Sequence, residues 1–217
     1  EAVSVGRAVK AVSVLCFDNG HGLTLWISVE SLYLARKDRR YADNVLHDLV
    51  GIFETIKDFH NTTERVNQLK DAVKNNAADR LSEVGAELEE AERLSKYAPV
   101  ITDKIASGEI PLRVTHNDTK LNNVLFDRTT DEGLCVIDLD TVMPGSALYD
   151  FGDALRFGAS NASEDETDLS KVWFDLDKFG AFTRGFLSET AECLTRAEID
   201  LLPESALIMT YECGIRF

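Results

Sequence analysis

From position 41 onward, most apolar residues recur at steps of three and four, which is the repeat of an amphipathic helix. Asn61, with Glu64 three positions later, is typical of the start of a helix, and so is Thr195 followed by Glu198. These patterns predict helices from about Tyr41 to Phe59, from Asn61 through Val73, from Leu81 to Leu94, and over about 147–157, 171–188 and 195–215.

Short apolar runs rich in β-branched residues interrupt the helical pattern and predict strands. Val12–Phe17 and Leu23–Val29 flank an Asn-Gly turn, which favours a hairpin. Three more strands are expected at Leu112–Val114, Val124–Phe126 and Leu134–Ile137. The predicted fold class is therefore α+β and mostly α-helical.

Size and charge limit what the chain can do. Its 217 residues, 44% of them apolar, are enough for one large or two small domains with a real core. With 38 acidic and 23 basic residues the net charge is −15, which argues against nucleic acid or an anionic membrane as a partner. Much of this charge lies between Glu83 and Glu92, where we expect a solvent-exposed helix face.

Several features predict a cytoplasmic protein. No apolar run is long enough for a transmembrane helix, which needs about 18 residues or more. The N-terminus has no basic stretch leading into an apolar one, so we expect no signal peptide. The four cysteines lie far apart without a zinc-binding spacing, as is usual for reduced thiols.

The polar residues with chemical potential follow two of the short strands. Asp118 lies in the segment from Val114 to Phe126, and Asp138 and Asp140 follow the next strand. Loops fed by strands hold side chains firmly and leave them open to substrate. The three carboxylates are expected to converge with the amide oxygen of Asn123. A set of oxygen donors without His or Cys favours Mg²⁺ over Zn²⁺.

The spacing of His116, Asp118 and Asn123, followed by Asp138, resembles the catalytic and metal loops of the protein-kinase-like phosphotransferases. Within that superfamily it resembles the aminoglycoside phosphotransferase and choline kinase branch, because Thr-Lys-Leu-Asn follows Asp118 and Leu-Asp follows Asp138. The segments most similar to the N-acetylhexosamine 1-kinases are 59–62, 115–123, 142–146, 149–153 and 211–214. The resemblance covers about residues 41–217 and implies a kinase-like C-terminal lobe, with short β-strands carrying the catalytic and metal loops.

The resemblance implies roles for the loop residues. Asp118 is expected to accept the proton of the attacking hydroxyl, and Asn123 and Asp138 to hold Mg²⁺ against the phosphates of ATP. Asp140 has two interpretations, a further metal ligand, which we favour, or a contact to the sugar or a metal-bound water. Lys120 either offsets charge on the transferred phosphoryl group or is a surface lysine.

Supporting residues are expected around this centre. His116 is expected to brace the loop rather than act as the base, and Asp150 to stabilise the loop through backbone hydrogen bonds. Arg156 is a candidate for substrate binding, although an ion pair with Asp153 three positions earlier is the simpler interpretation. His60 is expected to cap or pack.

The nucleotide lobe of such kinases is not evident. Residues 1–40 are too few for five strands, and Gly20–Gly22 with Lys37 is a weak match to a glycine-rich loop and strand lysine. The predicted division is a hairpin-like segment at 1–40 and a kinase-like lobe at 41–217. The helical pattern stops at Phe217 without a cap, so we expect the lobe to be truncated there.

The expected activity is Mg²⁺-dependent transfer of the γ-phosphoryl group of ATP to a sugar hydroxyl, at the anomeric position of an N-acetylhexosamine. Choline and aminoglycosides are the other candidate acceptors. This chain alone is expected to bind nucleotide weakly and to be inactive. Two alternatives are an inactive pseudokinase or fragment, and a metal-dependent hydrolase built on the aspartate cluster.

Overall fold

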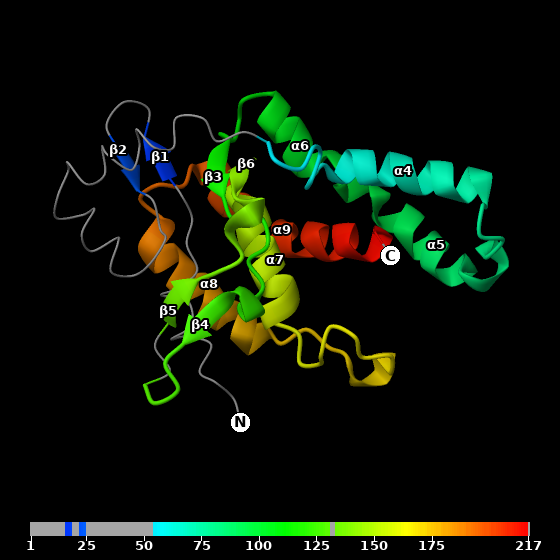
Figure 1. Cartoon of the computed structure of the whole chain (residues 1–217). Helices are drawn as coiled ribbons and strands as arrows, with labels where there is room; N and C mark the ends of the chain where they lie inside the picture. Colours follow the sequence, from blue (N-terminus) through cyan, green and yellow to red (C-terminus); the bar gives the residue numbers. More distant parts are fainter. Residues whose placement is uncertain (1–15, 19–21, 25–53, 131–132, 217) are drawn as a thin grey trace.

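Helices dominate the described part of the chain, with short strands at one side (Figure 1). The computed structural model describes residues 16–18, 22–24, 54–130 and 133–216. Its helices are α4 (Thr62–Asn75), α5 (Gly85–Leu94), α6 (Pro99–Ala106), α7 (Ala147–Gly158), α8 (Leu176–Thr190) and α9 (Arg196–Ile215). Its strands are β1 (Cys16–Asp18), β2 (Gly22–Thr24), β3 (Arg113–Thr115), β4 (Val124–Phe126), β5 (Gly133–Val136) and β6 (Met143–Gly145). This confirms the predicted α+β, mostly helical class.

The strands form three antiparallel pairs rather than one sheet: β1 with β2, β3 with β6, and β4 with β5. The β1–β2 pair agrees with the hairpin expected there, while the remainder of that predicted hairpin lies outside the described residues. β4 was predicted at its observed position, whereas β6 and α6 had no clear signal in the sequence. Among the described helices, none combines the length and apolar character needed to cross a lipid bilayer.

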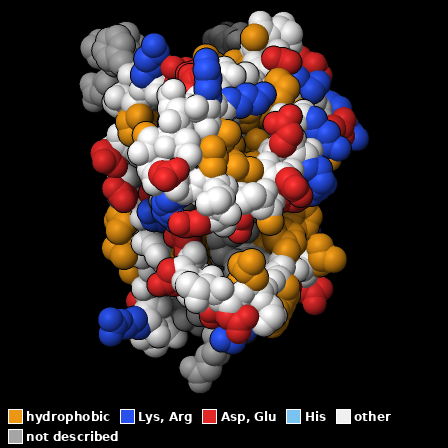
Figure 2. All heavy atoms as spheres, turned by 90° about the vertical axis from the view of Figure 1, so that its right-hand side faces the viewer, with side chains coloured by type: hydrophobic (Ala, Val, Ile, Leu, Met, Phe, Trp, Pro, Cys, Tyr) orange, Lys and Arg blue, Asp and Glu red, His pale blue; other side chains and the backbone are white. Residues whose placement is uncertain are grey.

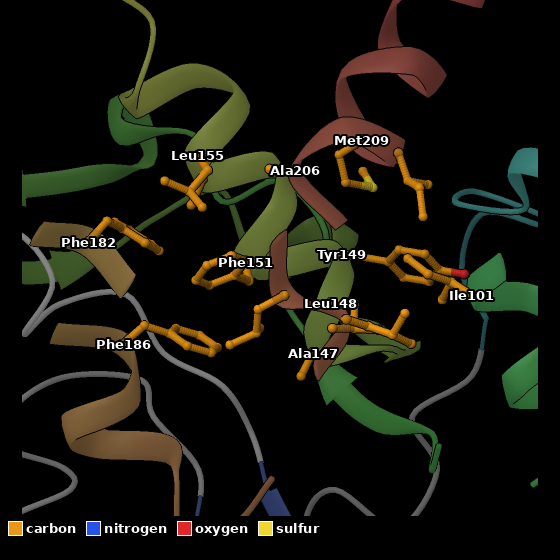
Figure 3. Packing of buried hydrophobic residues seen from close by; sticks show 14 of the residues in the cluster. Ile101, Ala147, Leu148, Tyr149, Phe151, Leu155, Phe182, Phe186, Ala206 and Met209 are labelled. Atoms are coloured by element: carbon orange, nitrogen blue, oxygen red, sulfur yellow. The ribbon is translucent and has the colours of Figure 1, made fainter. Parts of the chain in front are cut away.

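Helices α7 and α9 pack against each other at the centre of the fold. Gly152 permits the close approach, because a Cβ atom there would lie 2.5 Å from the carbonyl oxygen of Ser205 and 2.6 Å from Cγ of Met209. On one side of α7, Phe151 meets Phe186 of α8 with ring centroids 4.9 Å apart. On the other side Tyr149 points toward Ile101 of α6 (Figure 3). α7 therefore has core on both sides, and its start supports the candidate site.

Helix boundaries follow local capping chemistry. The Asn61 side chain accepts a hydrogen bond from the Glu64 backbone N–H at 3.1 Å, which confirms the predicted start of α4. Thr195 and Glu198 form the predicted capping box of α9. Asp175 caps α8 by accepting bonds from two backbone N–H groups, so this helix begins at Leu176, later than predicted.

The predicted first helix is wrong over its last part. Residues 54–60 form bends and turns, and Asp58 has a positive φ of 55°. This left-handed conformation is incompatible with a continuing right-handed helix. The remainder of that prediction, 41–53, lies outside the described residues. The predicted third helix also divides, because Leu81–Glu83 form a 3₁₀ turn before α5 begins at Gly85.

The acidic helix face is confirmed as a solvent face. The side chains of Glu87, Glu89, Glu90 and Glu92 on α5 are exposed, while Leu88 is half-buried. On the side of the molecule that carries α4 and α5, acidic and basic side chains are interspersed (Figure 2).

Buried polar contacts fix the strand that leads into the candidate site. Arg113 at the start of β3 forms a buried, two-bonded ion pair with Glu198, with Nε to Oε1 at 2.7 Å and an Nη to Oε2 at 2.8 Å. Gly145 lets β6 lie close against β3, because a Cβ atom there would stand 2.3 Å from Oγ1 of Thr115. The end of β3 is therefore held from two sides.

Candidate active site

The loop after β3 is held by the carboxylate of Asp150, in the first turn of α7. Its Oδ2 accepts a hydrogen bond from the His116 backbone N–H at 3.0 Å, and its Oδ1 accepts one from the Asn117 N–H at 2.7 Å. Asp150 is wholly buried, and burial raises the pKa of its carboxyl to about 6 despite these two bonds. The contacts are those expected of a loop-supporting residue.

Asn117 is the most extensively bonded residue of this loop. Its φ is 66°. Asparagine tolerates this left-handed conformation better than most residues do. The side-chain amide donates to the backbone oxygens of Thr115 and Thr141, at 3.1 and 3.0 Å. Its Oδ1 accepts from the Thr115 hydroxyl at 2.9 Å, so the asparagine fixes its own strained backbone and ties the loop to the next one.

His116 joins the two loops through its ring. Nδ1 accepts a hydrogen bond from the Asp118 backbone N–H at 3.2 Å. The ring proton therefore belongs on Nε2, which donates to the carbonyl of Ile137 at 3.0 Å. The ring is buried, and both its nitrogens are engaged. This arrangement favours a bracing role, because neither nitrogen is left to take a proton from a substrate.

Asp118 follows these fixed residues and presents its carboxylate toward solvent. Its Oδ2 accepts from Asn123 Nδ2 at 2.8 Å and lies 3.0 Å from Lys120 Nζ. The Asp118 side chain is 25% exposed, so a substrate can reach it. The hydrogen bond to Asp118 raises the pKa of Lys120, which keeps the ammonium charged beside the carboxylate.

The second loop carries two exposed carboxylates. Asp138 follows β5 with a φ of 64°, and Asp140 lies in the 3₁₀ turn Leu139–Thr141. The neighbouring Asp140 carboxyl raises the pKa of Asp138, with smaller contributions from desolvation and from the charge of Asp118. Asp118 and Asp140 therefore both lie within electrostatic reach of Asp138.

The described residues contain no ready-made cluster of three or more His, Cys, Asp or Glu side chains that is arranged to hold a metal ion. The amide group of Asn123 also turns its nitrogen, rather than its oxygen, toward Asp118. The donor types still suit a hard cation, because carboxylate and amide oxygens are what Mg²⁺ prefers. The metal-binding role of Asn123, Asp138 and Asp140 stays a proposal.

Arg156 forms the ion pair with Asp153 that was the simpler of its two interpretations. Its guanidinium lies 2.9 Å from Oδ1 of Asp153, three positions earlier in α7, and 2.6 Å from Oε1 of Glu164. The other oxygen of Asp153, Oδ2, is buried without a hydrogen-bond partner among the described residues. The charge of Asp118 contributes to raising the pKa of Asp153, after the larger effect of burial, so this ion pair lies near the candidate site.

His60 and Glu212 form a buried pair next to this loop, and the sequence did not predict their contact. His60 Nδ1 is 2.7 Å from Oε1 of Glu212 on α9, and His60 Nε2 is 2.8 Å from the carbonyl oxygen of Asn117. The packing role expected for His60 is consistent with this position. Nothing in the sequence linked it to Glu212, which is 152 positions away.

A comparison with protein families assigns most of the chain to one family. Residues 22–178 match the phosphotransferase enzyme family (APH), which is more than two thirds of the chain. The matched region includes Asp118, Asn123, Asp138, Asp150 and Arg156, and it begins inside the segment 1–40.

Proposed function

Because this chain belongs to the phosphotransferase enzyme family, we propose that it carries the catalytic loop of an ATP-dependent kinase for a small molecule. The proposed acceptor is a sugar, with the anomeric hydroxyl of an N-acetylhexosamine as the first candidate. The choice of acceptor is supported by the similarity of segments such as 115–123 and 149–153 to the N-acetylhexosamine 1-kinases.

The observation that carries the proposal is the anchoring of Asp118. One carboxylate oxygen, Oδ2, is held by Asn123 and Lys120. No hydrogen bond to the other oxygen, Oδ1, is found among the described residues. Asp118 would orient an acceptor hydroxyl through Oδ1 and take its proton as the hydroxyl oxygen bonds to the γ-phosphorus and ADP leaves. Lys120 would offset the charge of the phosphoryl group while it is transferred.

The exposed carboxylates are the proposed metal ligands. The hydrogen bond and the charge of Asp140 raise the pKa of Asp138, and a bound cation would favour the ionised form of both carboxylates. We propose that these two residues, with the amide oxygen of Asn123, hold Mg²⁺. The ion would neutralise charge on the phosphates of the nucleotide.

An apolar surface beside these carboxylates suits the base of a nucleotide. Leu125 of β4 pairs with Cys135 of β5, so these two side chains lie on one face of the β4–β5 ribbon, and Ile137 follows directly after the end of β5. Leu125 is 45% exposed and Ile137 is 38% exposed. We propose that a purine ring packs on this face, with its phosphates toward Asp138.

Arg156 is proposed as an acceptor-binding residue, because its partner Asp153 lies within electrostatic reach of Asp118. Its guanidinium is held by Asp153 and Glu164, so it presents its remaining donors in a fixed orientation. The residues 1–40 are proposed to form less than a complete nucleotide lobe.

The test is a coupled assay of ADP release by the full-length natural protein, with Mg²⁺, ATP and a panel of N-acetylhexosamines, choline and aminoglycosides. Asp118→Asn is expected to lower kcat at least about a hundredfold, because the proton acceptor is lost. Asp103→Asn, an exposed aspartate on α6, is the matched control and should leave turnover unchanged.

Turnover that survives Asp118→Asn would contradict the assignment of the base. Absence of MgATP binding by calorimetry in the folded wild-type protein would contradict the kinase proposal and favour the inactive pseudokinase or fragment. Turnover with choline or an aminoglycoside but not with an N-acetylhexosamine would overturn only the acceptor assignment.

A further inference from the structure

The imidazole of His60 lies between two groups that only accept hydrogen bonds. The Glu212 carboxylate faces Nδ1 at 2.7 Å, and the Asn117 carbonyl faces Nε2 at 2.8 Å. The other oxygen of Glu212 accepts a hydrogen bond from the Thr62 hydroxyl at 2.6 Å. Both ring nitrogens therefore carry a proton, and His60 is an imidazolium ion.

The surroundings of His60 carry more negative than positive charge. Glu212 faces it from α9, and Asp150 and Asp153 lie within electrostatic reach on α7. The ring of Tyr149 packs beside it with centroids 5.0 Å apart, while Arg216 reaches only the neighbouring Phe59 ring. Burial lowers the pKa of His60, but the hydrogen bond and charge of Glu212, with smaller help from Asn117 and Asp153, outweigh it and leave the pKa raised above 6.5.

We propose that His60 and Glu212 are positioning residues, whose ion pair holds the backbone carbonyl of Asn117 and through it the orientation of Asp118. The kinetic part of this proposal rests on the proposed function, whereas the structural part does not. The acceptor of the His60 bond is the residue immediately before the proposed base, and its φ is 66°. A backbone in this sparsely populated region needs its surroundings to hold it in place.

Deprotonation of His60 at Nε2 would replace its hydrogen bond to the Asn117 carbonyl with a repulsive contact. The remaining proton would stay on Nδ1 beside the Glu212 carboxylate, and the lone pair of Nε2 would then face the Asn117 carbonyl oxygen. A group with a raised folded-state pKa stabilises the fold fully below its unfolded value, and this contribution is lost as the pH rises through the folded value. The hydrogen bond to Asn117 is therefore present below the raised folded-state pKa of His60 and is lost as the pH rises through it.

The structural part is tested by NMR on the ¹⁵N-labelled full chain, without substrate. The imidazole nitrogens of His60 are expected to show two attached protons near neutral pH. The backbone amides of Asn117 and Asp118 should shift with the midpoint at which His60 titrates. A neutral His60 with one N–H at pH 6, or amide shifts that do not follow the titration, would overturn the proposal.

Two variants separate positioning from folding. Glu212→Gln keeps the shape of the side chain and removes its charge, so the midpoint of His60 should move to lower pH. Thr62→Val removes the other donor to Glu212 but leaves the Asn117 contact, and the amides of Asn117 and Asp118 should still titrate with His60. The proposal would be contradicted if both variants shifted the His60 midpoint and the Asn117 and Asp118 amides equally. Such a result would show that the His60–Glu212 pair only stabilises the fold.

The kinetic part uses MgATP with whichever acceptor the panel identifies. Glu212→Gln should lower kcat by about tenfold to a hundredfold at a pH between the His60 midpoints of the variant and the wild type, with the KM for ATP changed much less, because a displaced base slows the chemical step. The alkaline limb of the kcat profile should move to lower pH in this variant and stay in place in Thr62→Val. Unchanged profiles in an active enzyme would overturn the kinetic part, whereas failure to find any acceptor would count against the proposed function and leave the NMR result to decide the structural part.

Discussion

The two loops of the candidate site are built in opposite ways. On the side of Asp118, the backbone N–H groups of His116 and Asn117 and both nitrogens of the His116 ring are hydrogen-bonded within the protein. On the other side, Asp138 and Asp140 are exposed, and Asp140 lies close enough to Asp138 to raise its pKa. The chain itself fixes the geometry of the first loop, whereas the carboxylates of the second loop are open to solvent and, in our proposal, bind a cation.

This difference fits a division of labour in phosphoryl transfer. A base must be placed within a fraction of an ångström before the substrate arrives, which buried hydrogen bonds achieve. Metal ligands instead have to bind and release a hydrated ion together with its nucleotide, which exposed carboxylates allow. The comparison predicts that substitutions on the first loop change stability, and that substitutions on the second loop change ligand binding.

The largest effect is expected from Asp150→Ala, which leaves the buried N–H groups of His116 and Asn117 without acceptors. The loss of both bonds should lower the free energy of unfolding by about 4 kcal/mol. Asp140→Ala is the matched change on the exposed loop. It should alter the free energy of unfolding by less than about 0.5 kcal/mol. Urea denaturation of the two variants measures both values, and similar losses would break the comparison.

A smaller effect is expected where α7 carries the first loop against α9. Gly152→Ala places a Cβ 2.5 Å from a backbone oxygen of α9. This overpacking should cost about 2 kcal/mol of stability. Gly158→Ala, in the same helix, meets nothing within 4 Å. It should stabilise the fold by about 0.5 kcal/mol, because alanine favours the helix more than glycine does.

Thermal unfolding of these two glycine variants checks the prediction. The Tm should fall in Gly152→Ala and rise in Gly158→Ala. A Gly152→Ala variant as stable as the wild type would show that α7 can move away from α9. Such a helix would not hold the first loop rigidly.

A third effect is a pH dependence carried by Asp150. Its pKa is about 6 when folded against an ordinary value of 3.8, so the folded chain binds this proton more tightly than the unfolded chain. The contribution of Asp150 to stability should therefore decrease as the pH rises from about 4 to about 6. The difference in unfolding free energy between wild type and Asp150→Asn, which cannot titrate there, isolates this slope. A difference that stays constant or grows over this range would contradict the buried environment of Asp150.

Local chemistry explains what the sequence predicted well. The caps at Asn61 and Thr195 act over three residues, and the strand at Val124–Phe126 lies between clear turn residues, so each was visible in a short window. The grouping of Asp118 with Asn123 followed from their spacing in one loop. The left-handed turn at Asp58 was missed because the apolar repeat continues through it.

The remaining contacts depend on tertiary packing and have no local signal. Glu198 and Arg113 are 85 positions apart, and Glu212 and His60 are 152 apart, yet each pair is buried and hydrogen-bonded. A buried charged residue such as Glu198 or Glu212 of α9 needs a partner, but the local sequence does not say which one. The sequence consequently predicted candidate residues for the site and not the network that holds them.

The measurement that tests the account most directly uses Mn²⁺ in place of Mg²⁺, added with ATP to the ¹⁵N-labelled full-length protein. Paramagnetic broadening should be strongest at Asn123, Asp138 and Asp140 and should extend to Asp118, and Asp138→Asn should abolish it without unfolding the protein. Broadening centred elsewhere, or unchanged in Asp138→Asn, would contradict a site in which the two loops meet around one metal ion.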